Sequence, residues 1–126
     1  MPRIPALILS TALIALALVP ARAAELLMVE QQGCHYCIEW KETLGPIYPK
    51  TPEGKYAPLR IVDIAATDTA DADLKGRVVF TPTFILIEDG QEIDRLEGYP
   101  GEDFFWPLLE RMLIRSTDYS APAATN

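Results

Sequence analysis

The chain contains two cysteines, Cys34 and Cys37, in a C-x-x-C pattern. A short apolar run of strand type, residues 26–29, precedes them, and Gly33 marks the turn between that run and the cysteines. From Cys34 onward, apolar and polar residues alternate with helical spacing until Gly45 and the proline after it end the run. We therefore expect Cys34 at the N-terminus of a helix and Cys37 one turn inside it.

A cysteine at a helix N-terminus can react as a thiolate, because the unpaired N–H groups of the first turn and the positive end of the helix dipole favour an anion. An ordinary thiol has a pKa of about 8.5, and cysteines in such settings commonly fall to roughly 3.5–7.5. The placement predicts thiol–disulfide exchange, with Cys34 as the nucleophile. Cys37, turned toward the core, is then the resolving thiol that attacks a mixed disulfide and releases the partner. No cofactor is expected beyond the Cys34–Cys37 disulfide.

Two other uses of the cysteines remain open. A purely structural disulfide would close a loop of only four residues, which the chain-entropy model values at roughly 2 kcal/mol, against about 3 for a fifteen-residue loop. Metal ligation by Cys34, Cys37 and His35 lacks a second ligand cluster elsewhere in the chain, which makes a poor zinc site. Redox activity is the favoured interpretation, and we predict no metal.

The two residues between the cysteines, His35 and Tyr36, are the candidates for tuning the redox pair. A protonated His35 would stabilise a Cys34 thiolate and make the protein more oxidising. An exposed His35 side chain without a role is an equal alternative.

Residues 1–23 have the pattern of a secretory signal peptide. Arg3 supplies the positive charge, residues 4–19 form the apolar stretch, and Ala21-Arg22-Ala23 offers a cleavage site after Ala23. The apolar stretch is shorter than the ~20 residues of a membrane span, although an uncleaved anchor stays an alternative. We expect a bacterial periplasmic protein, with a domain over residues 24–116 and a flexible tail over 117–126. In that oxidising compartment, a reduced C-x-x-C pair needs an electron donor.

The charge of the chain is acidic. Removal of residues 1–23 takes away Arg3 and Arg22 and no acidic residue, so the net charge falls from −7 to −9. Such a charge argues against nucleic acid or anionic membranes as partners. A mature chain of about a hundred residues supports one compact domain, and we expect a monomer.

The remaining elements follow from the period of the apolar residues and from turn residues. Residues 46–58, rich in proline, are predicted to form a loop with Tyr48 and Tyr56 packed across its surface. A proline cannot donate to a sheet ladder, so Pro82 should mark the start of a strand. The segments after the loop are predicted, in order, to be a strand at 59–64, a short helix within 65–76 capped by Thr67 or Thr69, a strand from Pro82 to 88, a hairpin turn at Asp89-Gly90, a strand at 92–97, and a helix from Glu102 with a kink or irregular start at Pro107.

This order resembles the thioredoxin fold, an α/β fold whose central four-stranded mixed sheet is flanked by helices in a βαβ unit followed by a ββα unit. The resemblance rests on the C-x-x-C pair at a strand-to-helix turn, on Thr81-Pro82 where the family has its cis-proline, and on the hairpin with its final helix. It covers nearly all of the mature chain. It implies that Thr81 and Pro82 lie beside the disulfide, where the backbone of Thr81 binds an extended substrate peptide.

A closer resemblance is to the SoxS-type periplasmic thioredoxins of bacterial sulfur-oxidation systems. The matching stretches are Glu30-Gln31-x-Gly33-Cys34-x-Tyr36-Cys37, Pro46-Ile47-Tyr48-Pro49-Lys50-Thr51, Ala57-Pro58-Leu59-Arg60, Phe80-Thr81-Pro82-Thr83-Phe84 and Glu97-Gly98-Tyr99-Pro100-Gly101-Glu102-Asp103-Phe104-Phe105-Trp106. This resemblance implies a reductant for the thiol of a Sox sulfur-carrier protein, itself supplied with electrons by a membrane thiol transporter.

The resemblance also implies that one group is missing. The buried carboxylate that thioredoxins use as a proton shuttle falls at Met28 in this chain. Glu30 or Glu39 could substitute, although a solvated surface acid is the favoured interpretation of each. Two further functions stay open: a disulfide oxidant or isomerase, and a non-catalytic module that holds a partner or a metal such as copper.

Overall fold

The computed structural model describes Met1 and residues 24–123. The predicted signal sequence from residue 2 onward, its cleavage site and the last three residues of the predicted tail lie outside the described residues. The elements of the described part are β1 (Ala24–Glu30), α1 (His35–Thr43), the 3₁₀ helix η1 (Tyr48–Lys50), α2 (Pro52–Tyr56), β2 (Leu59–Asp63), the 3₁₀ helix η2 (Ile64–Thr69), β3 (Thr83–Glu88), β4 (Gln91–Glu97) and α3 (Glu102–Ser116).

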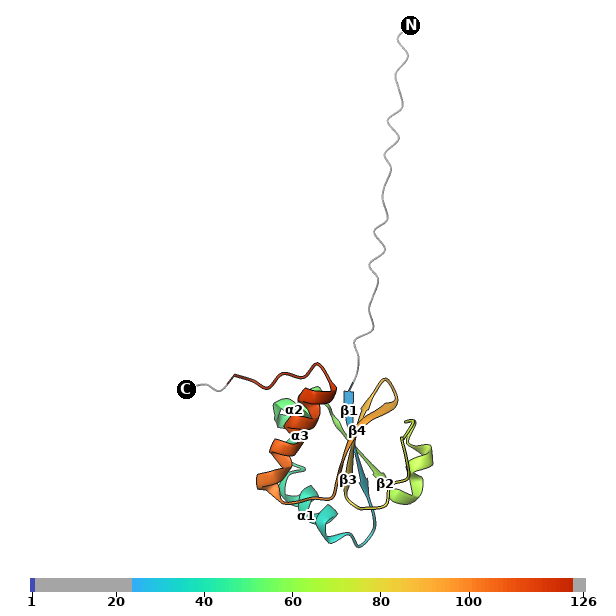
Figure 1. Cartoon of the computed structure of the whole chain (residues 1–126), viewed down its shortest axis with the longest axis vertical. Helices are drawn as coiled ribbons and strands as arrows, with labels where there is room; N and C mark the ends of the chain where they lie inside the picture. The colour runs from blue at the N-terminus through green and yellow to red at the C-terminus, as the bar shows by residue number, and fades with distance from the viewer. Residues whose placement is uncertain (2–23, 124–126) are drawn as a thin grey trace.

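The four strands form one mixed sheet in the order β2-β1-β3-β4 (Figure 1). β1 runs parallel to β2 and antiparallel to β3, and β3 and β4 form the predicted hairpin. The central strand β1 is covered on both faces, and its run Leu26–Val29 is therefore apolar throughout instead of alternating. The predicted α/β fold with a four-stranded mixed sheet is confirmed.

Each face of the sheet has its own apolar cluster. On one face, α1, α2 and α3 cover side chains that include Met28 and Phe84 (Figure 1). On the other face, η2 and the segment after it cover Leu27 and Ile85. β1 sends alternate side chains into the two clusters, as a strand must. The strand end that leads into the cysteines is therefore packed on both faces.

The face covered by helices is built around Trp40, the largest fully buried side chain of the described residues. Its ring centroid lies 5.9 Å from that of Tyr48, 5.2 Å from that of Phe84 and 5.6 Å from that of Phe105. The tilted and edge-on geometries are those that aromatic pairs prefer. Because Trp40 belongs to α1, this cluster packs the helix that carries Cys37 against the core.

The stretch 46–58 is not a loop, which corrects the prediction. It contains η1 and α2, and prolines stand in the first turn of both: Pro49 in η1 and Pro52 in α2. Proline is compatible with a first turn because the N–H group it lacks has no partner there. Thr51 caps α2 by accepting a hydrogen bond from the Gly54 amide at 3.0 Å. These prolines therefore start short helices and do not prevent them.

Tyr48 also differs from its prediction, because it lies in the core and not on the surface. Its hydroxyl donates a hydrogen bond of 2.7 Å to the carbonyl of Ala57. Burial, followed by the nearby charge of Glu53, raises the pKa of the Tyr48 phenol well above its usual range. Tyr56 lies nearer the surface and packs edge-on against Tyr119 at 5.2 Å between ring centroids. Tyr119 is buried, so the segment predicted to be a flexible tail is anchored at this residue.

Two other segments differ in detail from the sequence prediction. The predicted helix within 65–76 is the shorter 3₁₀ helix η2, and its cap is Asp63, which accepts a hydrogen bond of 2.8 Å from the Ala65 amide, and not a threonine. α3 begins at Glu102 as predicted and includes Pro107. None of the helices in the described part of the chain is long and apolar enough to cross a membrane.

Candidate active site

A tight turn connects β1 to α1 and places Cys34 at the helix start. The amide of Cys34 donates a hydrogen bond of 3.1 Å to the carbonyl of Gln31. Gly33 has a φ of 77°, in the left-handed region that favours glycine. Cys34 is the N-cap of α1, with extended backbone angles. The predicted helix start at Cys34 is confirmed.

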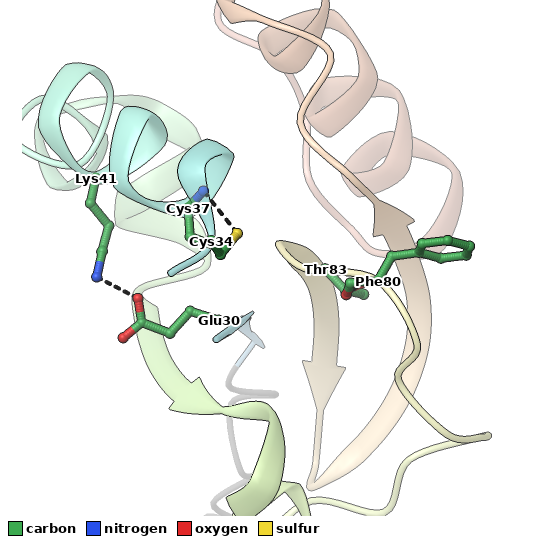
Figure 2. Close-up of a disulfide and its surroundings, with 6 residues drawn as sticks. All are labelled: Glu30, Cys34, Cys37, Lys41, Phe80 and Thr83. Atoms are coloured by element: carbon green, nitrogen blue, oxygen red, sulfur yellow. Dashed lines mark hydrogen bonds and ion pairs between the residues drawn. A yellow bond between two sulfur atoms is a disulfide. The ribbon is translucent and has the colours of Figure 1, made fainter. Parts of the chain in front are cut away.

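Cys34 and Cys37 form a disulfide, with 5.2 Å between their Cα atoms. The amide of Cys37 donates to Cys34 Sγ at 3.2 Å, so the sulfur occupies the place of a capping oxygen (Figure 2). This is the hydrogen bond and helix-end field that would stabilise a thiolate after reduction. Cys37 is only 1% exposed, whereas Cys34 is partly exposed. A partner can therefore reach Cys34 more easily than Cys37.

The loop that precedes β3 lies at the same end of the sheet as the two cysteines. Val29 near the end of β1 pairs with Thr83, the first residue of β3. The Thr81–Pro82 peptide is cis, as predicted. Thr83 Oγ1 donates to the carbonyl of Phe80 at 2.6 Å, and the Gly98 amide donates to the carbonyl of Pro82 at 2.8 Å. These two bonds fix the loop, whose labelled residues Phe80 and Thr83 are seen across from the disulfide in Figure 2.

Thr81 stands apart from these hydrogen bonds. Within residues 24–123, neither its amide nor its carbonyl takes part in a backbone hydrogen bond. A free amide and carbonyl at the end of a strand can pair with an added strand. The role of Thr81 and Pro82 in substrate binding stays a prediction.

Exposed aromatic side chains lie on α1 and on the loop that precedes β3. Tyr36 and Phe80 are both exposed, and a shallow pocket separates Tyr36 from the segment Tyr99–Gly101 that leads into α3. The sequence pattern marked that segment only as a turn. Its position beside α1 depends on how α3 packs against the sheet, which the local sequence does not show.

His35 points into solvent, with 84% of its side chain exposed. Its Nε2 lies 3.9 Å from Glu39 Oε2, one helical turn farther along α1. The same contact places the Glu39 carboxylate at the helix surface. Because solvent screens exposed charges, His35 should have only a small electrostatic effect on the Cys34–Cys37 pair. The tuning roles of His35 and Tyr36 remain predictions.

We predict that His35→Ala shifts the reduction potential of the Cys34–Cys37 couple by less than about 30 mV, toward more reducing values. A protonated His35 would favour the Cys34 thiolate of the reduced form, so its removal acts toward more reducing values, but exposed charge pairs contribute no more than about 1 kcal/mol. Equilibrium titration of both proteins against glutathione measures the difference. A shift more than twice that size would show that His35 acts directly on the thiolate despite its exposure.

Met28, which stands at the position of the thioredoxin proton shuttle, and Glu30, one of its two candidate substitutes, lie in different surroundings. Met28 is fully buried in the core cluster that contains Cys37. Glu30, at the end of β1, forms an ion pair with Lys41 of α1 (Figure 2). Sequence spacing gave no sign of this ion pair between a strand and a helix.

The active element of the site is therefore the disulfide. Within residues 24–123, no group of three or more His, Cys, Asp or Glu side chains could hold a metal ion. His35, the third residue of the metal-site alternative, lies against Glu39. The arrangement can exchange one disulfide for another through an accessible sulfur backed by a buried one.

Comparison with known proteins agrees with this chemistry. A family model described as a thioredoxin-like domain matches residues 18–113. A search of curated proteins gave no match. Among solved structures, the periplasmic thioredoxin SoxS from Paracoccus pantotrophus, in its reduced form, is 47% identical, with a TM-score of 0.68, and the match covers 71% of this chain and 94% of that one. Thioredoxin from Fasciola hepatica is 26% identical, with a TM-score of 0.53, and the match covers 71% of this chain and 80% of that one. The chain belongs to the thioredoxin-like family, and its Cys34–Cys37 pair is that of a thiol–disulfide oxidoreductase.

Proposed function

We propose that the protein is a periplasmic reductant that acts on a disulfide or blocked cysteine of a partner protein. The observation that carries the proposal is the 47% identity to a periplasmic thioredoxin over 94% of that chain, beside the C-x-x-C disulfide that this chain carries. The apolar segment 4–19 and the Ala21-Arg22-Ala23 site support export and cleavage after Ala23.

The proposed reaction starts from the reduced pair. The Cys34 thiolate attacks one sulfur of the partner disulfide, forms a mixed disulfide and expels the other sulfur as a thiolate. The Cys37 thiolate then attacks Cys34 Sγ, forms the Cys34–Cys37 bond and releases the remaining partner sulfur. Two electrons pass to the partner, whose released thiolates take up protons. Exposure supports this order, since Cys34 is the sulfur that a partner can reach.

The partner segment is proposed to bind between the Thr81–Pro82 loop and the start of α1. The unpaired backbone groups of Thr81 can accept an added strand beside the disulfide. Exposed Tyr36 on α1 and exposed Phe80 on the loop offer apolar contact area. Both features suit an extended segment of a protein that carries a cysteine.

For the partner itself, we propose a Sox sulfur-carrier protein. The similarity to SoxS, together with the motifs Glu30–Cys37 and Glu97–Trp106, supports this assignment. A membrane thiol transporter is the proposed source of electrons, because a periplasmic pair that works as a reductant must be reduced again after each cycle. We expect the protein to act as a monomer.

We predict that Cys37→Ser captures the physiological partner. A serine hydroxyl cannot displace a thiol, so the cycle stops at the mixed disulfide with Cys34. Tagged Cys37→Ser protein, recovered from a periplasmic extract under non-reducing conditions, should carry a sulfur-carrier protein linked through its cysteine. Cys34→Ser is the matched control and should retain nothing.

The possible outcomes separate the alternatives. Unrelated secreted proteins on Cys37→Ser, without the carrier, would replace the Sox assignment with a general disulfide enzyme. A lack of any adduct would favour a non-catalytic binding module. Titration of the wild-type pair against glutathione gives its reduction potential and so the direction of electron transfer. Thioredoxin-like reductants have potentials near −270 mV and strong oxidants near −120 mV, both as approximate values.

A further inference from the structure

β4 carries a buried ion pair that the disulfide chemistry does not use. Glu92 has 2% of its side chain exposed and Arg95 has 19%. The guanidinium donates from Nε to Glu92 Oε1 at 2.6 Å and from Nη2 to Glu92 Oε2 at 2.7 Å. Such a bidentate pair fixes the orientation of the arginine side chain. Because the desolvation of two charges offsets much of their attraction, net stability alone does not account for the pair.

A β-bulge places these two side chains on the same face of the sheet. Residues three apart on a regular strand point to opposite faces. Here Glu92 pairs with Ile87 and Arg95 pairs with Ile85, which leaves one extra residue in β4 between the pairs. Ile85 and Ile87 belong to the apolar cluster on the face covered by η2 and the segment after it. Glu92 and Arg95 therefore face that segment.

The segment 73–77 lies along β4, on the side away from β3. Asp73 forms a parallel bridge with Gln91. Its amide donates to the Gly90 carbonyl at 2.7 Å, and its carbonyl accepts from the Glu92 amide at 2.9 Å. The parallel direction carries the chain toward the end of β4 that pairs with the start of β3. The segment therefore leads into the loop that precedes β3.

Glu92 and Arg95 hold this segment at three backbone groups. The Lys75 amide donates to Glu92 Oε2 at 2.7 Å. Arg95 Nη2 donates to the Gly76 carbonyl at 3.1 Å, and its Nη1 donates to the Arg77 carbonyl at 3.4 Å. Burial alone would raise the pKa of Glu92, but the hydrogen bonds from Arg95 and from the Lys75 amide hold that pKa below its usual range. The carboxylate therefore stays charged at neutral pH and keeps the guanidinium in place.

We propose that Arg95, held by Glu92, is a positioning residue that fixes the backbone of Thr81 for substrate binding. The inference rests on the proposed role of Thr81 in binding the partner. The far end of the loop is already held by the Pro82 carbonyl and the Thr83 hydroxyl. Arg95 holds the near end through its two carbonyl partners. The loop is thus fixed on both sides of the position that faces the disulfide (Figure 2).

The residues between the two ends have little packing of their own. Val78 is buried in the apolar cluster, whereas Val79 is 66% exposed and Phe80 is 59% exposed. A stretch with few buried contacts keeps one conformation only if its ends are fixed. Without Arg95, Thr81 samples more positions, and a partner segment has to order them as it binds. The affinity for a peptide then falls, while the chemistry of the disulfide is unchanged.

The test compares two substrates of the reduced protein. One is an extended peptide whose cysteine carries a coloured aromatic thiol as a mixed disulfide. The other is the same mixed disulfide of a single blocked cysteine, which lacks the flanking backbone. Stopped-flow mixing with excess substrate gives the half-saturating concentration and the limiting rate of thiol release.

Arg95→Gln should raise the half-saturating concentration of the peptide on the order of tenfold, the cost of ordering about one more residue. The limiting rate should stay the same, because Arg95 does not touch the reacting sulfurs. The reaction with the blocked cysteine and the reduction potential of the Cys34–Cys37 couple should match those of wild type.

Three variants separate positioning from stability. Arg115→Gln is the matched control, because Arg115 of α3 also forms a bidentate pair with a β4 carboxylate, that of Asp94, at 2.7 and 2.9 Å. Asp94 pairs with Leu86 on the face covered by the helices, away from the segment, so this variant should bind the peptide as wild type does. The double variant Glu92→Met with Arg95→Met replaces the pair by apolar side chains, which is often neutral for stability. Its melting temperature should stay near that of wild type while its half-saturating concentration stays raised. Arg95→Lys should lie between wild type and Arg95→Gln, because one ammonium group does not reproduce the guanidinium fork.

NMR relaxation of the backbone amides tests the loop without any substrate. The order parameters of Phe80 and Thr81 should fall in Arg95→Gln, from about 0.85 for rigid backbone toward the flexible range below about 0.6. Those of β1 should not change, which shows that the variant is folded.

The inference is wrong if Arg95→Gln keeps wild-type order parameters at Thr81, or if it loses reactivity equally toward the peptide and the blocked cysteine. It is also wrong if Arg115→Gln binds the peptide as weakly as Arg95→Gln, or if the double variant binds it as tightly as wild type. The proposed role of Thr81 fails separately, when the wild-type protein itself reacts with the peptide no better than with the blocked cysteine.

Discussion

Cys34→Ser is expected to lower catalysed disulfide turnover to the rate of the uncatalysed reaction. The N-cap position and the Cys37 amide, 3.2 Å from Cys34 Sγ, are arranged to stabilise a thiolate at this one atom. Cys37 cannot replace it, because Cys37 is buried in the core cluster. Reduction of a small disulfide protein, with dithiothreitol as electron source, gives the rate for each variant.

Cys37→Ser should also stop turnover, but it should fail at a later step. One equivalent of partner thiol is released as Cys34 attacks, and the mixed disulfide then persists. Both variants lose the same disulfide, whose four-residue loop is worth only roughly 2 kcal/mol. They therefore serve as controls for each other's stability. Stoichiometric release from Cys34→Ser, or sustained turnover by either variant, would contradict the proposed division of roles.

Trp40→Ala is expected to lower the free energy of unfolding by about 3–5 kcal/mol, the usual cost of removing a large buried aromatic side chain. Trp40 is fully buried and contacts three other aromatic rings. Small domains have a total stability of about 5–15 kcal/mol, so the variant loses a large part of it. Urea denaturation of the oxidised protein, followed by circular dichroism, measures the change.

Two variants on the same helix show whether the loss comes from this cluster. Ile38→Ala, at a side chain that is 47% exposed, should cost about 1 kcal/mol or less. Trp40→Phe should cost less than Trp40→Ala, because it keeps an aromatic ring. It also removes an indole N–H that is buried without a hydrogen-bond partner among the described residues. A Trp40→Ala variant within about 1 kcal/mol of wild type would show that the cluster does not hold α1 in place.

The sequence by itself determined the elements that depend on neighbouring residues. The apolar run 26–29, Gly33 and the C-x-x-C pattern predicted a strand, a turn and a helix that starts at Cys34, and the structure confirms each. Pro82 predicted the start of β3 because a proline cannot donate to the ladder. Asp89-Gly90 predicted the hairpin, since these residues adopt the positive φ angles of its turn.

The tertiary structure decided what depends on contacts between distant segments. η1 and α2 are too short to show a helical period, and their prolines at first-turn positions were interpreted as breakers. Tyr48 is buried because Trp40 and the Ala57 carbonyl surround it, which no local pattern shows. Glu30 and Lys41 meet only because α1 packs back across the end of β1. Spacing along the chain locates the two cysteines, whereas tertiary packing decides which charged side chains lie near them.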